Sequence, residues 1–137
     1  MDFVLYNMVV NSILVGIIIV TQFITYPLFK FIDFGFKKYH TAYTQRMGYV
    51  VAPLMIAELL LVIKITIQHY NNEIIILISI LTLIIWLSTF CIQVPVHNSI
   101  SKKITQNQIT FLIKSNYIRT FCWLLKLILS IQILHIN

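Results

Sequence analysis

Two residues of opposite charge, Glu58 and Lys126, stand inside long apolar stretches of this 137-residue chain. A charged side chain in a membrane-spanning helix costs a few kcal/mol, so such residues usually pair or take part in chemistry. Glu58 follows Arg46 by twelve residues, which is about 18 Å along a helix and near the middle of a ~30 Å hydrocarbon core. Lys126 lies seven residues after Arg119 and reaches a comparable depth with a small offset between the two helices. We therefore expect an intramembrane ion pair that either fixes helix register or handles a proton or a ligand.

A second group of polar side chains collects where the apolar stretches end. Gln22 and Tyr26 are four residues apart, as are Gln93 and His97, and this spacing puts both members of a pair on one helical face. Such residues also anchor helices at lipid headgroups. As a group, we expect them to line the cytoplasmic mouth of an apolar cavity that suits an anionic or quinone-like amphiphile, with Glu58 at its floor. The candidate ligand-binding residues are Gln22, Tyr26, His40, Tyr43, Arg46, Glu58, Gln93, His97, Asn98, Asn116, Arg119 and Trp123.

Metal and nucleotide chemistry have little support in the sequence. His40 and His97 are candidate haem or metal ligands, but no HxxH, ExxH or CxxCH spacing accompanies them. The chain also contains no nucleotide fingerprint, phosphate-binding loop or Ser-His-Asp set. The sequence therefore predicts no metal site, identifies no cofactor and assigns no catalytic residue.

The composition places these residues in a membrane protein. Hydrophobic residues make up 59% of the chain and charged residues 10%, against roughly 25% charged in an average soluble domain. These values, with a mean hydropathy of +0.89, exclude a disordered chain, a collagen-like repeat and an ordinary soluble domain. The net charge of +6 comes from few basic residues between apolar runs, a pattern typical of an anionic membrane surface. The expected partners are the lipid bilayer and a hydrophobic small molecule, and not nucleic acid.

The apolar residues form four runs, each long enough to cross a bilayer as a helix. The alternation of a membrane β-barrel is absent. The sequence therefore predicts an all-α integral membrane protein, a four-transmembrane-helix bundle that forms a single domain over residues 1–137. Aromatic and lysine residues alternate between the runs and predict short interfacial helices in the loops. The four runs cover residues 3–29, 47–67, 74–96 and 117–136.

The distribution of lysine and arginine predicts the orientation. Residues 30–46 and 97–116 carry most of the basic residues, whereas the turn over residues 69–73 contains neither Lys nor Arg. By the positive-inside rule, both basic loops face the cytoplasm and both termini lie outside. The sequence thus predicts a multi-pass protein of the cell (inner) membrane.

The chain also shows traces of an internal repeat. Gln22 and Pro27 stand at the end of the first run, and Gln93 and Pro95 at the end of the third. An arginine stands near the start of the second and fourth runs. Each half thus resembles an outside-to-inside helix, a basic loop and a returning helix, which predicts two tandem helix hairpins.

Three short segments resemble the anthrone-oxygenase-like family of small four-helix membrane proteins. The resemblance covers the whole chain in topology and about a dozen positions in motif. It implies a four-helix fold and, for the family's named members, oxidation of polyketide anthrones, with no catalytic residues to carry over. His97 interrupts the Pro-Val-Asn pattern typical of the family. The segments are Thr25-Tyr26-Pro27-Leu28, Val94-Pro95-Val96-His97-Asn98 and Asn116-Tyr117-Ile118-Arg119-Thr120.

Three functions are compatible with these observations, and the sequence leaves open whether the chain is an enzyme. The first is an accessory membrane protein that binds a small amphiphile or lipid-like ligand between its helices. The second is a membrane oxidoreductase or oxygenase for an aromatic or quinone-like substrate, in which His40 or His97 moves a proton and Glu58 is a buried acid or base. The third is a transporter or channel subunit with Glu58 and Lys126 on a polar path. It requires a homo-oligomer, because four helices are few for a transporter.

Overall fold

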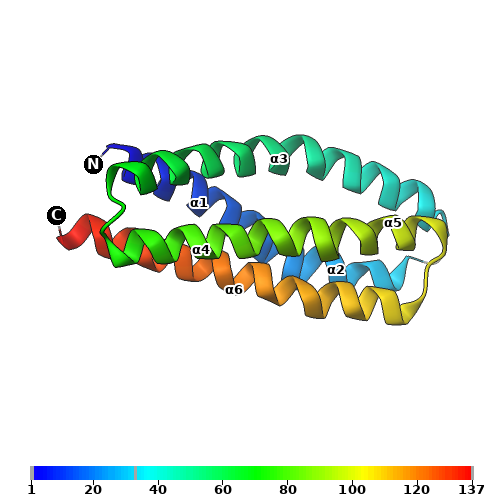
Figure 1. The fold of residues 1–137 in the computed structure, drawn as a ribbon. Helices are drawn as coiled ribbons and strands as arrows, with labels where there is room; N and C mark the ends of the chain where they lie inside the picture. The colour runs from blue at the N-terminus through cyan, green and yellow to red at the C-terminus, as the bar shows by residue number, and fades with distance from the viewer. Residues whose placement is uncertain (1, 33, 137) are drawn as a thin grey trace.

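The chain folds into a bundle of four long helical spans, in which each span runs antiparallel to the one before it (Figure 1). The structure, a computed structural model, describes residues 2–32 and 34–136, and no strand occurs among them. This confirms the predicted all-α four-helix architecture. Each span is long and apolar enough to cross a membrane. The spans are Asp2–Phe31, Phe36–Gln68, Glu73–Lys102 and Gln106–His135.

The second and fourth spans are single α-helices, whereas the first and third each contain a π-helical turn. The fourth helix packs against the first and third spans, and the first also packs against the second. The single helices are α3 (Phe36–Gln68) and α6 (Gln106–Ile136). The first span comprises α1 (Asp2–Val20), the π turn η1 (Thr21–Thr25), α2 (Tyr26–Leu28) and the 3₁₀ turn η2 (Phe29–Phe31). The third comprises α4 (Glu73–Ser88), the π turn η3 (Thr89–Gln93) and α5 (Val94–Lys102).

Both π turns directly precede a proline. The backbone N–H of Tyr26 donates to Thr21 O, and that of Val94 donates to Thr89 O, so each bond spans five residues. A proline inside an α-helix has no N–H to donate and collides with the carbonyl four residues earlier. The wider turn accommodates the ring, and the span continues past it instead of ending there.

The two π turns also occupy matching places in the two halves of the chain. The same number of residues separates Thr21 from Thr89 as Pro27 from Pro95. Each threonine hydroxyl donates to the carbonyl oxygen four residues earlier, at 2.8 Å for Thr21 and 2.7 Å for Thr89. This shared geometry agrees with two tandem helix hairpins.

The basic segments differ from the expectation of short interfacial helices. The described turn residues are 32, 34 and 35 in the first segment and 103–105 in the second, because the long helices extend through most of each predicted loop. Gly35, in the left-handed region at φ 69°, ends the first turn and allows α3 to begin directly afterwards. Some apolar residues of these segments pack into the bundle, whereas others, such as Phe31, Phe34 and Phe111, are exposed. The buried cluster comprises Tyr26, Phe29, Phe36, Ile100, Ile109 and Leu112.

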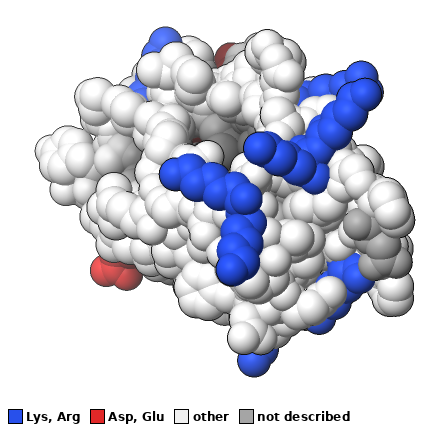
Figure 2. Space-filling view, turned by 90° about the vertical axis from the view of Figure 1, so that its right-hand side faces the viewer, with Lys and Arg blue, Asp and Glu red and all other residues white. Residues whose placement is uncertain are grey.

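Charge separates the two ends of the bundle. Figure 2 looks onto the end that carries the two short turns, where Lys and Arg side chains gather. The described termini and the turn between α3 and α4 lie at the opposite end (Figure 1). Asp2 and Glu73 are the acidic residues in the first turns of α1 and α4 there. Tyr26 and His97 lie toward the basic end of the bundle.

Candidate functional site

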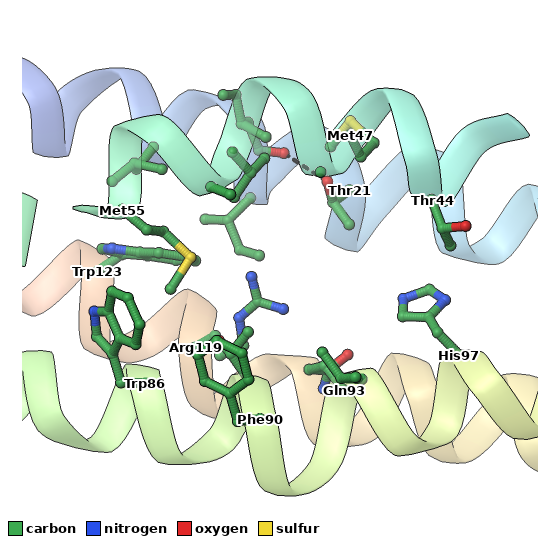
Figure 3. A pocket seen from close by; sticks show the side chains of 18 of the residues that line it. Thr21, Thr44, Met47, Met55, Trp86, Phe90, Gln93, His97, Arg119 and Trp123 are labelled. Carbon is green, nitrogen blue, oxygen red and sulfur yellow. Dashed lines mark hydrogen bonds between the residues drawn. The ribbon is translucent and has the colours of Figure 1, made fainter. Parts of the chain in front are cut away.

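A cavity of about 490 Å³ lies among the four spans, between the bundle's centre and its basic end (Figure 3). Ligand pockets commonly enclose 300–1,000 Å³ and combine apolar walls with a few polar groups. Here Met55, Trp86 and Trp123 are at one end of the cavity and His97 at the other. The π turns supply Thr21 and Gln93 to its wall.

The cavity opens on the side of the bundle between α3 and the third span. Its rim includes Ile56 on α3, Phe90 on η3 and Val94 on α5. These side chains are 50%, 57% and 41% exposed, respectively, although they line the cavity. If the bundle spans a bilayer, this opening faces the lipid chains and not the aqueous phase.

Arg119 brings a positive charge into this apolar space. Its side chain is 7% exposed, and its guanidinium lies between α3 and the third span (Figure 3). The guanidinium carbon is 5.1 Å from the ring centroid of Trp123, a cation–π contact. Its Nε atom has no hydrogen-bond partner. No lining residue is Asp or Glu, and the ion pair found in the described part of the chain joins Glu58 and Lys126.

Beside the cavity, four side chains form a continuous hydrogen-bonded chain. Tyr26 Oη lies 2.9 Å from His97 Nε2, and His97 Nδ1 lies 2.8 Å from His40 Nε2. His40 Nδ1 lies 2.9 Å from Ser101 Oγ, whose hydroxyl donates to His97 O at 3.0 Å. Over the described residues, no group of three or more His, Cys, Asp or Glu side chains is placed to hold a metal. The two histidines thus bond to each other and to hydroxyl groups.

With both imidazoles neutral and the Ser101 hydroxyl donating to His97 O, these contacts predict one direction for every proton in the chain. Ser101 has one hydroxyl proton and gives it to His97 O, so it must accept from His40 Nδ1–H. His40 Nε2 then carries a lone pair and accepts from His97 Nδ1–H. His97 Nε2 in turn accepts from the Tyr26 hydroxyl. The result is a one-way relay from the cavity wall toward the basic end.

Gln22 forms a clamp behind the cavity wall that ties η1 to α6. Its Oε1 accepts from Asn116 Nδ2 at 2.8 Å and from the Thr120 hydroxyl at 3.3 Å. Its Nε2 donates to Ile113 O at 3.1 Å. Gln22 and Asn116 are buried but do not line the cavity. Their arrangement therefore serves helix packing and supports the wall from behind.

Beyond the Trp123 end of the cavity lies a buried charged network. Lys126 Nζ lies 2.7 Å from Glu58 Oε1, and both side chains are 0% exposed. Trp123 Nε1 donates to Glu58 Oε2 at 3.2 Å. With its amide oriented so that both ends are paired, Asn11 donates to Glu58 Oε1 at 3.1 Å and accepts from Leu127 N at 2.9 Å. Trp123 thus joins the cavity to this network.

The residues proposed from sequence divide into three groups by position. Arg46 lies exposed on α3, outside the cavity wall. Gln22, His40, Glu58, Asn116 and Lys126 are buried next to the wall without lining it. The residues that line the cavity are Tyr26, Tyr43, Gln93, His97, Asn98, Arg119 and Trp123.

Several site residues were missing from the sequence-based set. Trp86 and Phe90 precede Gln93 and His97 at helical spacing on the third span, and all four line the cavity. Ser101 follows His97 by one more turn. This periodic stripe is the signal that would have identified them, because residues spaced by three or four share a helical face. Thr21, Thr44 and Asn11 carry no comparable signal.

Comparisons of the chain with protein-family models, with curated proteins and with solved structures find no match. The fold and the site therefore define the class: a four-helix bundle of membrane-spanning length with a side-opening apolar cavity. A buried arginine with no acidic residue in the surrounding cavity wall, together with a histidine relay, distinguishes this cavity.

Proposed function

We propose that this chain is a multi-pass membrane protein that binds a small amphiphile in the side-opening cavity. The polar head would contact Arg119, Gln93 and Tyr26, and the apolar part would pack on the walls. The observation that carries this proposal is the cavity itself, which is of ligand size, largely apolar and open toward the position of the lipid chains.

Unpaired polar atoms on the lining residues support a bound head group. Arg119 Nε, Gln93 Oε1 and Trp86 Nε1 are buried and have no hydrogen-bond partner. Most buried polar groups in proteins are paired, and leaving one unpaired costs roughly 1–3 kcal/mol. These atoms are closed off from the open space, so a polar head would pair with them after a small rotation of the side chains, whereas a purely apolar ligand would not pair with them at all.

The charge distribution supports an orientation with the basic end in the cytoplasm. Residues 30–46 and 97–116 would then face the cytoplasm and both termini the outside of the cell (inner) membrane. Because the relay runs from the cavity toward this end, the head of the ligand would lie nearer the cytoplasmic leaflet.

The test is co-purification of the ligand with a matched pair of glycine variants. A Cβ added at Gly48, which lines the cavity, meets no atom within 4 Å, and the same holds at exposed Gly16 on α1. Mass spectrometry of protein purified in mild detergent should find an enriched amphiphile in wild type and in Gly16→Phe. Gly48→Phe should lose it. Equal amounts in both variants, or only bulk lipid in wild type, would contradict the proposal.

A second candidate function is oxidation or reduction of an aromatic or quinone-like amphiphile in the same cavity. The relay from Tyr26 through His97 and His40 to Ser101 favours it, because such reactions exchange protons with the substrate. The same purified sample tests it by its absorbance spectrum and by identification of the ligand. A bound quinone, or a flavin or haem band, would support this function, and a colourless protein with a saturated lipid would count against it.

A further inference from the structure

We propose that the amphiphile is an anion, a long-chain carboxylate or phosphate whose head pairs with Arg119. Its acyl chain would leave along the groove between α3 and α4. This inference rests on the proposed function of the cavity and adds the charge and shape of the ligand.

We infer the negative charge of the ligand from the positions of the acidic residues, none of which, among those described, lies beside Arg119. Of the four acidic residues in the sequence, Asp2 and Glu73 lie at the opposite end, and Glu58 is bonded to Lys126. Asp33 lies outside the described residues. No carboxylate of the described chain thus neutralises the guanidinium.

An unpaired cation in an apolar cavity is costly, because its desolvation is not offset by an opposite charge. Guanidinium groups bind carboxylates and phosphates through two parallel hydrogen bonds. The guanidinium of Arg119 lines the cavity and is held from the side by the Trp123 ring. A neutral quinone would fill the volume but leave the charge uncompensated, so an anion suits the site better.

The neighbouring polar groups agree with an anionic head. The imidazoles of His40 and His97 use both ring nitrogens within the relay. Tyr26 gives its proton to His97, and Gln93 Nε2 donates to Ser115 Oγ at 3.0 Å. Among the described residues that line the cavity, Arg119 is the one Lys or Arg side chain, so it is the charged donor for an anion there.

We infer the shape of the ligand from a second hollow, which lies next to the cavity. A groove of about 420 Å³ runs between α3 and α4, and Trp86 lines both it and the cavity. Its walls include Leu59, Ile63 and Leu83, and its hydroxyl-bearing members are Thr66, Ser79 and Thr82.

The combined length of cavity and groove suits one acyl chain. From Gln93 to Ser79 the third span rises by about 21 Å at 1.5 Å per residue. A lipid chain covers roughly 15 Å, half of the ~30 Å hydrocarbon core. A single chain therefore fits with its head at Arg119 and its end beyond Trp86.

The two tryptophans of the sequence provide the readout, because both line the cavity. Bromine atoms on a bound chain quench tryptophan fluorescence at short range. The probe is 9,10-dibromostearate in nonionic detergent micelles, and its methyl ester is the neutral counterpart. In wild type, the acid should reach half-maximal quenching at a concentration at least about tenfold lower than the ester, as expected for hydrogen bonds to a charged group.

Arginine variants identify the charge responsible. Arg119→Gln should remove the difference between acid and ester, and Arg119→Lys should retain part of it. Arg46→Gln is the matched control, because Arg46 is exposed on α3 and lies outside the cavity wall. It should behave as wild type. Equal quenching by acid and ester in wild type would overturn the anion assignment, and so would a preference for the acid that Arg119→Gln leaves intact.

The Gly48→Phe variant distinguishes failure of the anion assignment from failure of the proposed function. If it abolishes quenching by both probes while wild type shows no preference, the cavity binds amphiphiles without selecting anions. If quenching is unchanged in it, the cavity is not the site and both proposals fail. Brominated phosphatidylglycerol distinguishes the two sources of the anion. If it quenches in a way that depends on Arg119, the ligand is a membrane phospholipid. If it does not quench but 9,10-dibromostearate does, the ligand is a single-chain acid.

Discussion

Glu58 receives hydrogen bonds from three side chains on two other helices. Lys126 and Trp123 approach from α6, and Asn11 approaches from α1. Such a network satisfies the carboxylate only while all its members are present, so it locks the relative positions of α1, α3 and α6. The pairing with Lys126 was predictable, because the two residues carry opposite charges inside apolar runs and a small offset between the helices brings them to the same depth.

Removing the lysine should therefore leave a buried, unpaired carboxylate. We expect Lys126→Met to lower the free energy of unfolding by about 3–5 kcal/mol. The double variant Glu58→Gln/Lys126→Met should recover most of this loss, since it removes both charges. Unfolding in detergent, followed by circular dichroism, measures both. Lys114→Met, on the exposed face of α6, is the control, and a single Lys126 variant as stable as that control would contradict the role of the pair.

The histidine relay predicts one tautomer for each ring. In protein labelled with ¹⁵N-histidine, His40 and His97 should both carry their proton on Nδ1, as the bonds to Ser101 and Tyr26 require. NMR correlation of ring nitrogens and carbon-bound protons distinguishes the two tautomers. His69, exposed at the opposite end, should show ordinary exchange between tautomers. Finding the proton on Nε2 of either relay histidine would refute the assignment.

The meeting of His40 and His97 was not predictable from sequence. The two residues are 57 positions apart and lie on different spans. Their contact depends on how α3 leans toward α5, and side-chain types alone do not set that angle. The sequence analysis could therefore place both residues near one end of the bundle, but it could not place them within hydrogen-bond distance.

At the scale of the elements, hydropathy located the spans but not all their starts. The second and fourth apolar runs begin at residues 47 and 117, whereas α3 begins at Phe36 and α6 at Gln106. Hydropathy reports where apolar side chains stop, while backbone hydrogen bonding continues into amphipathic residues that can pack on each other. The buried cluster around Phe29 supplies that packing.

The positions of the π turns were only partly predictable from the sequence. A proline usually bends or ends a helix, but at Pro27 and Pro95 the structure widens the preceding turn and the span continues. Whether a helix stops, kinks or widens at a proline depends on what its next turn can pack against. Here His97 and Ile100 on α5 pack toward the other spans, and this favours continuation.

The clamp between η1 and α6 should contribute measurably to helix association. Gln22→Leu removes the acceptor for Asn116 and Thr120, so we expect a loss of about 1–2 kcal/mol, near the upper range for polar contacts between membrane helices. Denaturation by SDS in mixed micelles measures it. Gln132→Leu, at an exposed position of α6, should change stability by less than about 0.5 kcal/mol. Equal effects of the two substitutions would show that the clamp adds nothing.

At the scale of the whole molecule, the basic end predicts the topology. Cys91 and Cys122 are both free, so they can be replaced by serine and single cysteines introduced at Lys103 or Asn71. An impermeant maleimide added to intact spheroplasts should label the cysteine at position 71. The cysteine at 103 should react only after lysis, because positively charged turns remain in the cytoplasm. The reverse pattern would invert the orientation.

The position of the cavity's opening between α3 and the third span changes how affinity must be expressed. A ligand that enters sideways from the bilayer equilibrates first with the lipid phase, so occupancy follows its mole fraction in the membrane and not its concentration in water. Each added methylene favours partitioning by about 0.8 kcal/mol, or roughly fourfold. Apparent affinity measured in water should therefore rise with chain length and fall as lipid is added, even where the contacts within the cavity are identical.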